Sequence, residues 1–192
     1  MNSLRVLIAE DDSLTALNLK EQLQSMGHEV AGIVESGCEV VQAAVTLKVD
    51  LITLDISLPD MSGLVAARDI LQHAPVAIIM ITGYSNPEFV ADAADAGVMS
   101  YLVKPIGEKD LRAAIPVAMQ RFQEMQSIRR ELKDLKETLE TRKLVEKAKG
   151  ILMRRQQLSE QEAFKKIQKD SQNRNKRMDD IARAIIDAET FL

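Results

Sequence analysis

The 192-residue sequence contains one cysteine, no tryptophan and only six aromatic residues. A single cysteine excludes a disulfide framework and fits a reducing compartment. Because Cys38 lies in an apolar stretch, we expect a small buried side chain rather than a nucleophile. No apolar run approaches the ~20 residues that a membrane-spanning helix needs. A strand-like run begins at Leu4 and leaves no room for a signal peptide, so we expect a cytoplasmic protein with no membrane segment.

Charge is unevenly distributed along the chain. Residues 1–117 carry 7 Lys or Arg and 16 Asp or Glu, a net charge of −9, whereas residues 118–192 carry a net charge of +5. Within the second part, residues 141–178 alone carry +8. An acidic front half and a basic tail indicate a control domain joined to a module that binds a polyanion. The alternative is two solvated faces that differ by chance.

The first half of the chain alternates strand-like runs with segments of helical spacing. The strand-like runs are residues 5–9, 30–34, 51–54, 76–81 and 100–103. Apolar residues at helical spacing lie between them: Leu14, Leu17, Leu19 and Leu23; Val40, Val41, Ala44 and Leu47; Leu64, Ala67 and Leu71; Phe89, Val90, Ala93 and Ala94. Gly27 and Gly97 fall where helices should end in a left-handed cap. Five such units predict an α/β fold, a parallel sheet with helices on both faces.

Polar residues occupy the carboxyl ends of four of the predicted strands. They are Glu10, Asp11 and Asp12 after the first, Asp55 after the third, Thr82 (followed by Gly83) after the fourth, and Lys104 (followed by Pro105) after the fifth. The carboxyl ends of parallel strands meet at one edge of the sheet, where ligands bind. Clustered carboxylates repel unless a cation intervenes, and their oxygen atoms suit Mg²⁺. Acidic residues at single strand ends are common, but four such ends together favour a functional site.

Three segments closely resemble the receiver domain of bacterial response regulators: residues 6–12 (VLIAEDD), 54–63 (LDISLPDMSG) and 101–105 (YLVKP). The resemblance covers roughly residues 3–120 and implies a flavodoxin-like (βα)5 receiver domain over residues 1–120. It implies a Mg²⁺ site formed by Glu10, Asp11, Asp55 and the carbonyl of Ser57, with Asp55 as the residue phosphorylated. It also implies that Thr82 and Tyr101 form a conformational switch, that Lys104 contacts the phosphoryl group, and that the Lys104–Pro105 peptide is cis.

The chemistry of these residues is consistent with that resemblance. Asp55 would be a carboxylate nucleophile toward a phosphohistidine on a partner histidine kinase. The metal and Lys104 would offset the charge on the transferred phosphoryl oxygens. Phosphorylated Asp55 would draw the Thr82 hydroxyl inward, and Tyr101 could turn into the vacated space. Since the group is transferred to the protein itself, and the sequence reveals no substrate pocket, we do not expect an enzyme.

A long helical segment follows, from Leu111 to about Gln156, with Pro116 early in the last receiver helix or at a kink. Its apolar residues follow the 3-4-3-4 spacing of a coiled coil: Met125, Ile128, Leu132, Leu135 and Leu139. We therefore expect a coiled-coil linker over residues 121–142 that pairs two copies into a homodimer. The alternative is one amphipathic helix that packs on its own chain.

Three apolar stripes then predict a small three-helix bundle. The stripes are Leu144, Ala148, Ile151 and Leu152; Ala163, Phe164 and Ile167; and Ile181, Ala182, Ile185 and Ile186. Residues 159–162 (SEQE) match a capping box at the start of the second helix. Basic residues are dense on this bundle: Arg142, Lys143, Lys147, Lys149, Arg154, Arg155, Lys165, Lys166, Arg174, Lys176 and Arg177. Such density favours a phosphate backbone as partner, although a basic face is often merely solvated.

Acidic residues on the third helix argue against DNA. In a helix-turn-helix protein this helix should enter the major groove. Its first turn carries Asp179 and Asp180, Asp187 and Glu189 follow, and only Arg183 opposes them. These carboxylates would face the DNA phosphates.

Residues 140–153, 159–164 and 178–182 resemble the ANTAR domain, the output module of the AmiR and NasR transcription antitermination regulators. The resemblance covers about residues 128–190 and is most specific at Ala148-Lys149-Gly150. It implies binding of paired hairpins in nascent leader RNA, with these contact residues: Arg142, Lys143, Lys147, Lys149, Gly150, Arg154, Arg155, Arg174, Lys176 and Arg177. The scarcity of aromatic residues favours recognition by charge and shape over single-strand stacking. Two alternatives remain, a receiver-controlled DNA-binding transcription factor and a phosphorylation-gated protein-interaction module.

Overall fold

The computed structural model describes residues 3–83 and 96–190, and the chain divides into two compact units. Unit 1 comprises residues 1–126 and unit 2 comprises residues 127–192.

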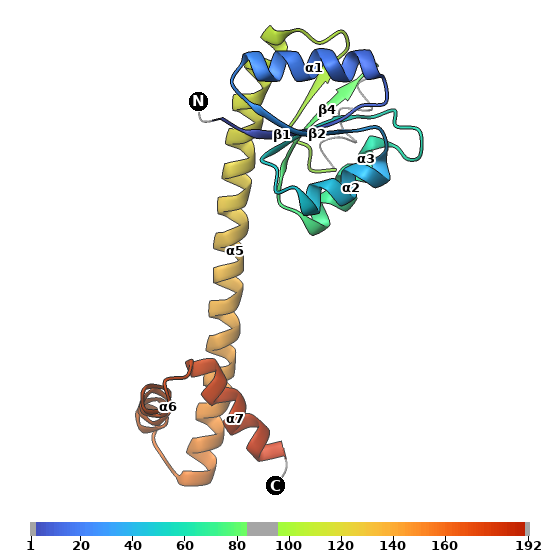
Figure 1. Cartoon of the computed structure of the whole chain (residues 1–192). Coiled ribbons are helices and arrows are strands. Elements are labelled where there is room, and N and C mark those ends of the chain that lie inside the picture. The colour runs from blue at the N-terminus through green and yellow to red at the C-terminus, as the bar shows by residue number, and fades with distance from the viewer. Residues whose placement is uncertain (1–2, 84–95, 191–192) are drawn as a thin grey trace. The chain divides into compact units, whose positions relative to one another are not determined.

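Unit 1 is built around a five-stranded parallel sheet (Figure 1). Its strands are β1 (Arg5–Ala9), β2 (Glu29–Val34), β3 (Leu51–Asp55), β4 (Ala77–Thr82) and β5 (Ser100–Val103). Their order across the sheet is β2-β1-β3-β4-β5, and every neighbouring pair is parallel. The five strands expected from the sequence are confirmed, and the ends of three of them differ by one residue.

Three of the described helices of unit 1 begin at a side chain that caps their first turn. The described helices are α1 (Ser13–Ser25), α2 (Gly37–Thr46), α3 (Gly63–His73) and the first part of α5 (Glu108–Gln156). Asp12, Ser36 and Ser62 each accept a hydrogen bond from a backbone N–H of the helix that follows. Gly27 and Gly97 have φ of +85° and +82°, as expected of left-handed caps. The helix expected around residues 89–94 lies outside the described residues.

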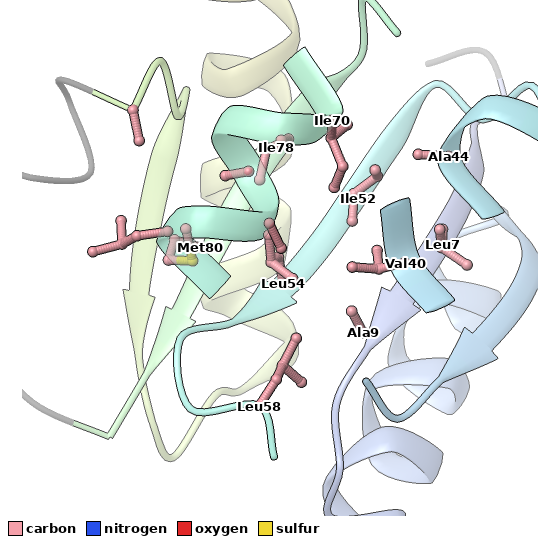
Figure 2. Packing of buried hydrophobic residues seen from close by; sticks show 14 of the residues in the cluster. Leu7, Ala9, Val40, Ala44, Ile52, Leu54, Leu58, Ile70, Ile78 and Met80 are labelled. Carbon is pink, nitrogen blue, oxygen red and sulfur yellow. The ribbon is translucent and has the colours of Figure 1, made fainter. Parts of the chain in front are cut away.

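Alternate residues of the strands are buried on opposite faces of the sheet. One face packs against α2 and α3 (Figure 2) and includes Leu7, Ala9, Ile52, Leu54, Ile78 and Met80. The other face packs against α1 and the first part of α5 and includes Val6, Ile8, Leu51, Ile79 and Ile81. Strands covered on both faces must be apolar throughout, which explains the continuous β-branched runs in the sequence.

Some side chains of unit 1 lie elsewhere than their sequence context predicts. The expectation that Cys38 is buried is wrong, because the first turn of α2 is at the surface and the residue is exposed. On α1, Leu19 and Leu23 are buried in the core, whereas Leu14 and Leu17 are 79% and 52% exposed. Apolar spacing therefore located the helix correctly but did not distinguish its buried side from its exposed side.

Unit 2 contains the second part of α5, helix α6 (Glu160–Arg174) and helix α7 (Met178–Thr190). The predicted capping box is confirmed: the Ser159 hydroxyl accepts from the Glu162 N–H, and the Glu162 carboxylate accepts from the Ser159 N–H. The three helices share a small core of Val145, Ala148, Leu152, Ala163, Ile167, Ile181 and Ala182. The expected bundle is therefore confirmed.

One predicted core position of this bundle is wrong. Phe164 lies beside the buried Ala163 on α6 but is itself 41% exposed. In the described part of the chain, no helix is both long and apolar enough to cross a membrane.

Candidate functional site

The polar residues at the strand ends meet at one edge of the sheet in unit 1. Asp55 is the last residue of β3, Glu10 follows β1, and Lys104 follows β5. Glu10 and Asp55 are almost completely buried. The Lys104–Pro105 peptide is cis, as the resemblance implied. The structure thus brings together residues that are up to 94 positions apart in the sequence.

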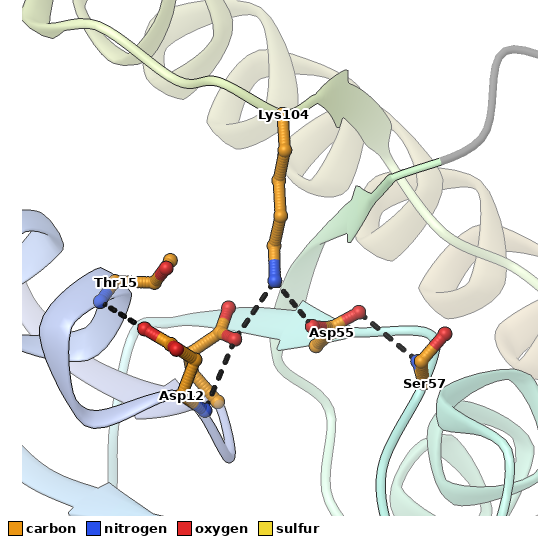
Figure 3. Close-up of polar contacts among 6 residues, drawn as sticks. Asp12, Thr15, Asp55, Ser57 and Lys104 are labelled. Atoms are coloured by element: carbon orange, nitrogen blue, oxygen red, sulfur yellow. Dashed lines mark hydrogen bonds and ion pairs between the residues drawn. The ribbon is translucent and has the colours of Figure 1, made fainter.

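Lys104 connects the two buried carboxylates (Figure 3). Its Nζ atom donates hydrogen bonds to Oδ2 of Asp55 at 2.5 Å and to Oε1 of Glu10 at 2.8 Å. Burial disfavours the charged ammonium, but hydrogen bonds and the charges of Asp55 and Glu10 outweigh this effect and hold the pKa of Lys104 above its ordinary value. Lys104 therefore remains a cation beside Asp55.

Glu10, Asp11 and Asp55 form a cluster of acidic oxygens. One oxygen from each lies within 4.8 Å of the others. Burial raises the pKa of Glu10, and the hydrogen bond from Lys104 only partly offsets this effect. Among the described residues, Glu10 Oε2 is buried with no hydrogen-bond partner. A buried carboxylate oxygen without a donor, beside two further carboxylates, fits a hard divalent cation.

The loop after Asp55 folds back over the end of β3. The Ser57 N–H donates to Asp55 Oδ1 at 3.0 Å, and the Gly63 N–H donates to the Ile56 carbonyl at 2.8 Å. A Cβ atom on Gly63 would lie 2.0 Å from the Asp55 carbonyl oxygen, so only glycine permits this approach. The loop geometry therefore determines where the Asp55 carboxylate points.

Asp60, in the same loop, was not singled out from the sequence. Its carboxylate accepts hydrogen bonds from the backbone N–H groups of Gly37 at 2.6 Å and Cys38 at 2.8 Å, at the start of α2. These bonds hold the pKa of Asp60 well below its usual range. The signal available in the sequence was an acidic residue directly after Pro59, within the segment that resembles receiver domains.

The two residues expected to form the switch differ in their surroundings. Thr82 is the last residue of β4 and is 2% exposed, at the same sheet edge as Asp55. Tyr101 lies on β5 and is 45% exposed. The structure thus places Thr82 at the site edge and leaves the Tyr101 ring at the surface of the described residues.

Eight of the ten predicted RNA-contact residues in unit 2 are exposed. They are Arg142, Lys143, Lys147, Arg154, Arg155, Arg174, Lys176 and Arg177. Some are paired with acids: Arg154 contacts Glu189 at 3.2 Å, and Arg177 contacts Asp179 at 3.3 Å. Exposed cations at this density can form ion pairs with phosphate groups.

Lys149 does not belong to that exposed set. Lys149 is 6% exposed, and its Nζ atom lies 2.8 Å from Oε1 of both Glu146 and Glu160. The hydrogen bonds that Lys149 donates to these two carboxylates raise its pKa. Through these two contacts the Lys149 ammonium joins α5 to the first turn of α6, which gives it a role within the bundle. Its role as an RNA contact stays a prediction. Gly150, the next residue, is half-buried.

The fold and the Asp55–Lys104 site define a class of protein. The response regulator receiver domain matches residues 6–116, and the ANTAR domain matches residues 133–186. The chain therefore belongs to the response regulators, as one with a receiver domain followed by an ANTAR domain.

Individual relatives agree with this assignment. The transcriptional regulatory protein PdtaR of Mycobacterium tuberculosis is 40% identical over 183 residues, which are 95% of this chain and 89% of that protein. Chemotaxis protein CheY of Thermotoga maritima is 36% identical over 102 residues, 53% of this chain and 85% of that protein. Among solved structures, the receiver domain of a modulated diguanylate cyclase from Desulfovibrio desulfuricans G20 is 31% identical with a TM-score of 0.59, and covers 64% of this chain and 98% of that one.

We expect Glu10→Gln to stabilise unit 1 against urea at pH 7 when divalent cations are absent. The folded state raises the pKa of Glu10, so the stability linked to this carboxyl is present below its unfolded pKa and is lost as the pH rises through the folded pKa. The variant should therefore exceed the wild type at pH 7 and match it below about pH 4. Asp11→Asn, at an exposed position, is the control. A wild type more stable than Glu10→Gln at pH 7 would contradict this prediction.

Proposed function

We propose that Asp55 accepts a phosphoryl group from a partner histidine kinase, and that phosphorylation governs binding of hairpins in nascent leader RNA by the ANTAR domain, which promotes transcription antitermination. One observation supports the input step above all: buried Asp55 contacts the Lys104 ammonium beside the carboxylates of Glu10 and Asp11. A carboxylate with an adjacent fixed cation and a cation-binding cluster is the arrangement that phosphoryl transfer requires.

In this transfer, a carboxylate oxygen of Asp55 attacks the phosphorus of a phosphohistidine. A P–O bond forms, the P–N bond breaks, and the imidazole leaves with the electron pair of the broken bond. Lys104, which already donates a hydrogen bond to Asp55, contacts the phosphoryl oxygens as they approach. Glu10, Asp11, Asp55 and the Ser57 carbonyl would hold Mg²⁺, which offsets negative charge on the phosphoryl oxygens when bound. Thr82, at the same edge, would donate its hydroxyl to the phosphorylated Asp55, and Tyr101 would turn inward.

The output step rests on the exposed cations of unit 2. A hairpin stem presents closely spaced phosphates, and the exposed Lys and Arg side chains on α5 and around the turn between α6 and α7 can pair with them. The acidic first turn of α7, with Asp179 and Asp180, disfavours insertion of that helix into a DNA groove.

We further propose that α5 pairs two copies of the chain through an apolar seam of Ile128, Leu132, Leu135 and Leu139. These four residues are 64%, 50%, 57% and 49% exposed in the single chain. They recur at the 4-3-4 spacing of a coiled coil, and their mutual burial would be favourable. Pairing brings two ANTAR domains to two hairpins, which raises affinity through effective concentration.

The phosphorylation step predicts that Asp55→Asn abolishes labelling by a small phosphodonor such as acetyl phosphate, because the nucleophilic carboxylate is lost. Phosphoprotein gel retardation or intact-mass spectrometry measures it. Asp60→Asn, in the same loop, removes no acceptor and should retain labelling. Undiminished labelling of Asp55→Asn would exclude Asp55 as the acceptor.

The RNA step predicts that joint replacement of Lys143 and Lys147 by Glu weakens hairpin binding about tenfold or more. Loss of two phosphate contacts should also reduce the slope of log affinity against log salt by about 1 to 2. Filter binding over a salt series measures both, with Lys109→Glu in unit 1 as the control. Duplex DNA of the same length run in parallel tests the DNA alternative. Unchanged affinity of the double variant would remove these cations from the RNA site, and tighter binding of the duplex would overturn the RNA proposal.

The pairing step predicts that Leu132→Asp with Leu135→Asp yields a monomer under conditions in which the wild type is a dimer. Two carboxylates in a closed seam would each be desolvated without a partner. Sedimentation equilibrium with and without acetyl phosphate measures the mass. Lys133→Asp places a carboxylate one residue off the seam and should leave the dimer intact. A double variant that still dimerises would contradict the coiled-coil assignment.

A further inference from the structure

Unit 2 contains a cavity of about 600 Å³ beside the exposed Phe164. Its apolar lining is contributed by Val145 on α5, Phe164 on α6 and Met178 at the start of α7. All three helices of the bundle therefore contribute to it. A hollow of this size and composition can accept a planar organic group.

The exposure of Phe164 is not explained by packing within the bundle. Ala163 and Ile167 of the same helix are fully buried in the core, whereas Phe164 is 41% exposed and lies outside that core. Phe164 also lines a second hollow of about 260 Å³, together with Gln161 and Lys165. The aromatic ring is thus accessible from two hollows.

Both signs of charge line the larger cavity. Arg142 and Arg177 contribute guanidinium groups, and Asp134, Glu137 and Glu146 contribute carboxylates. The carboxylates would repel a phosphate group inside the cavity. A nucleobase is neutral and carries both N–H donors and acceptors at its edge, so it can pair with either kind of side chain. The exposed Arg142 can contact a phosphate that flanks such a base, whereas Arg177 also contacts Asp179 at 3.3 Å.

We propose that this cavity binds one unpaired base from the loop of an RNA hairpin, stacked on Phe164. The proposal deepens the RNA-binding function proposed above and rests on it. Exposed cations give affinity for any RNA stem, whereas a single stacked base makes binding depend on the loop. Stacking on Phe164 would then allow the protein to distinguish the hairpin loop from other single-stranded RNA.

Among the described residues of unit 2, only Phe164 offers an aromatic ring for stacking. Residues 127–192 contain two aromatic residues, Phe164 and Phe191, and the second lies outside the described residues. A sheet that stacks successive bases needs several aromatic rings. The single ring of Phe164, in a cavity lined by both signs of charge, instead suits one base that projects from the loop. The RNA stem beside it would be bound by the exposed cations. The expectation from composition favoured recognition by charge and shape over single-strand stacking. The proposed contact with one base is an addition to that mode of recognition.

The test uses the full chain and a library of RNA hairpins with a fixed stem and a randomised loop. Wild-type protein first selects a loop, and affinity is then measured for Phe164→Ala, Phe164→Leu and Phe164→Tyr. Leucine preserves apolar bulk without a π face, and tyrosine preserves the ring. We expect about tenfold or greater loss for alanine and leucine and near wild-type affinity for tyrosine. Met153→Ala removes an exposed apolar side chain of α5 away from the cavity and is the matched control.

Abasic nucleotides placed at each loop position then identify the stacked base. At one position the abasic change should lower the binding affinity as much as Phe164→Ala does. The two changes together should lower the affinity no more than either change alone. A 2-aminopurine at that position should change its fluorescence on binding to the wild type but not to Phe164→Ala. Helix content and thermal midpoint of each variant, from circular dichroism, confirm that it is folded.

The outcomes separate this proposal from the one on which it rests. If Phe164→Leu binds the selected hairpin as tightly as the wild type while the Lys143 and Lys147 double variant does not, RNA binding stands and the base pocket is overturned. Additive losses at every abasic position would also overturn it. Loss of dimer mass in Phe164→Leu would assign the ring to a protein interface instead. If the wild type selects no hairpin from the library, both proposals fall.

Discussion

The requirement that a buried negative charge be balanced organises the receiver unit. Asp55 and Glu10 lie at the end of a sheet whose two faces are mostly apolar, where an unpaired carboxylate would be strongly disfavoured. The Lys104 ammonium reaches both of them. That contact requires the ends of β1, β3 and β5 to meet at one edge, which the parallel order of the sheet supplies. One carboxylate oxygen of Glu10 is still without a donor among the described residues, an arrangement that fits a further cation.

A second balanced charge stabilises the small helical unit. Its core consists largely of alanine and short aliphatic side chains, a modest amount of apolar surface for three helices. Lys149 adds a link between α5 and α6 through Glu146 and Glu160. The most family-specific part of the ANTAR sequence, Ala148-Lys149-Gly150, is thus placed inside the bundle rather than on its charged surface. The specificity of a motif does not show whether it contacts a ligand or supports the fold.

Most of the fold was predictable from the sequence because the signals were local. Buried parallel strands need continuous apolar runs, and the capping box at Ser159 is visible within four residues. The candidate site followed from topology, since residues at the ends of parallel strands must converge. Contacts across elements were not predictable in this way. Whether Lys149 faces solvent depends on where Glu160 lies after a turn, and whether Phe164 or its neighbour Ala163 is buried depends on the crossing of three helices. Cys38 is exposed while Gly37 and Val40 of the same helix are buried, and this depends on which side of α2 packs on the sheet.

The anchoring of the loop after Asp55 gives the receiver unit one stiff side. Gly63 is pressed against the Asp55 carbonyl, and Asp60 fastens the same loop to the start of α2. A new group on Asp55 therefore finds little freedom in that direction. The opposite side of the site is bounded by Thr82 and by the edge strand β5, whose other long edge has no strand beside it in the described sheet. The site is thus held firmly on the side of α2, and a displacement of the Asp55 side chain would find more room toward β5 than toward α2.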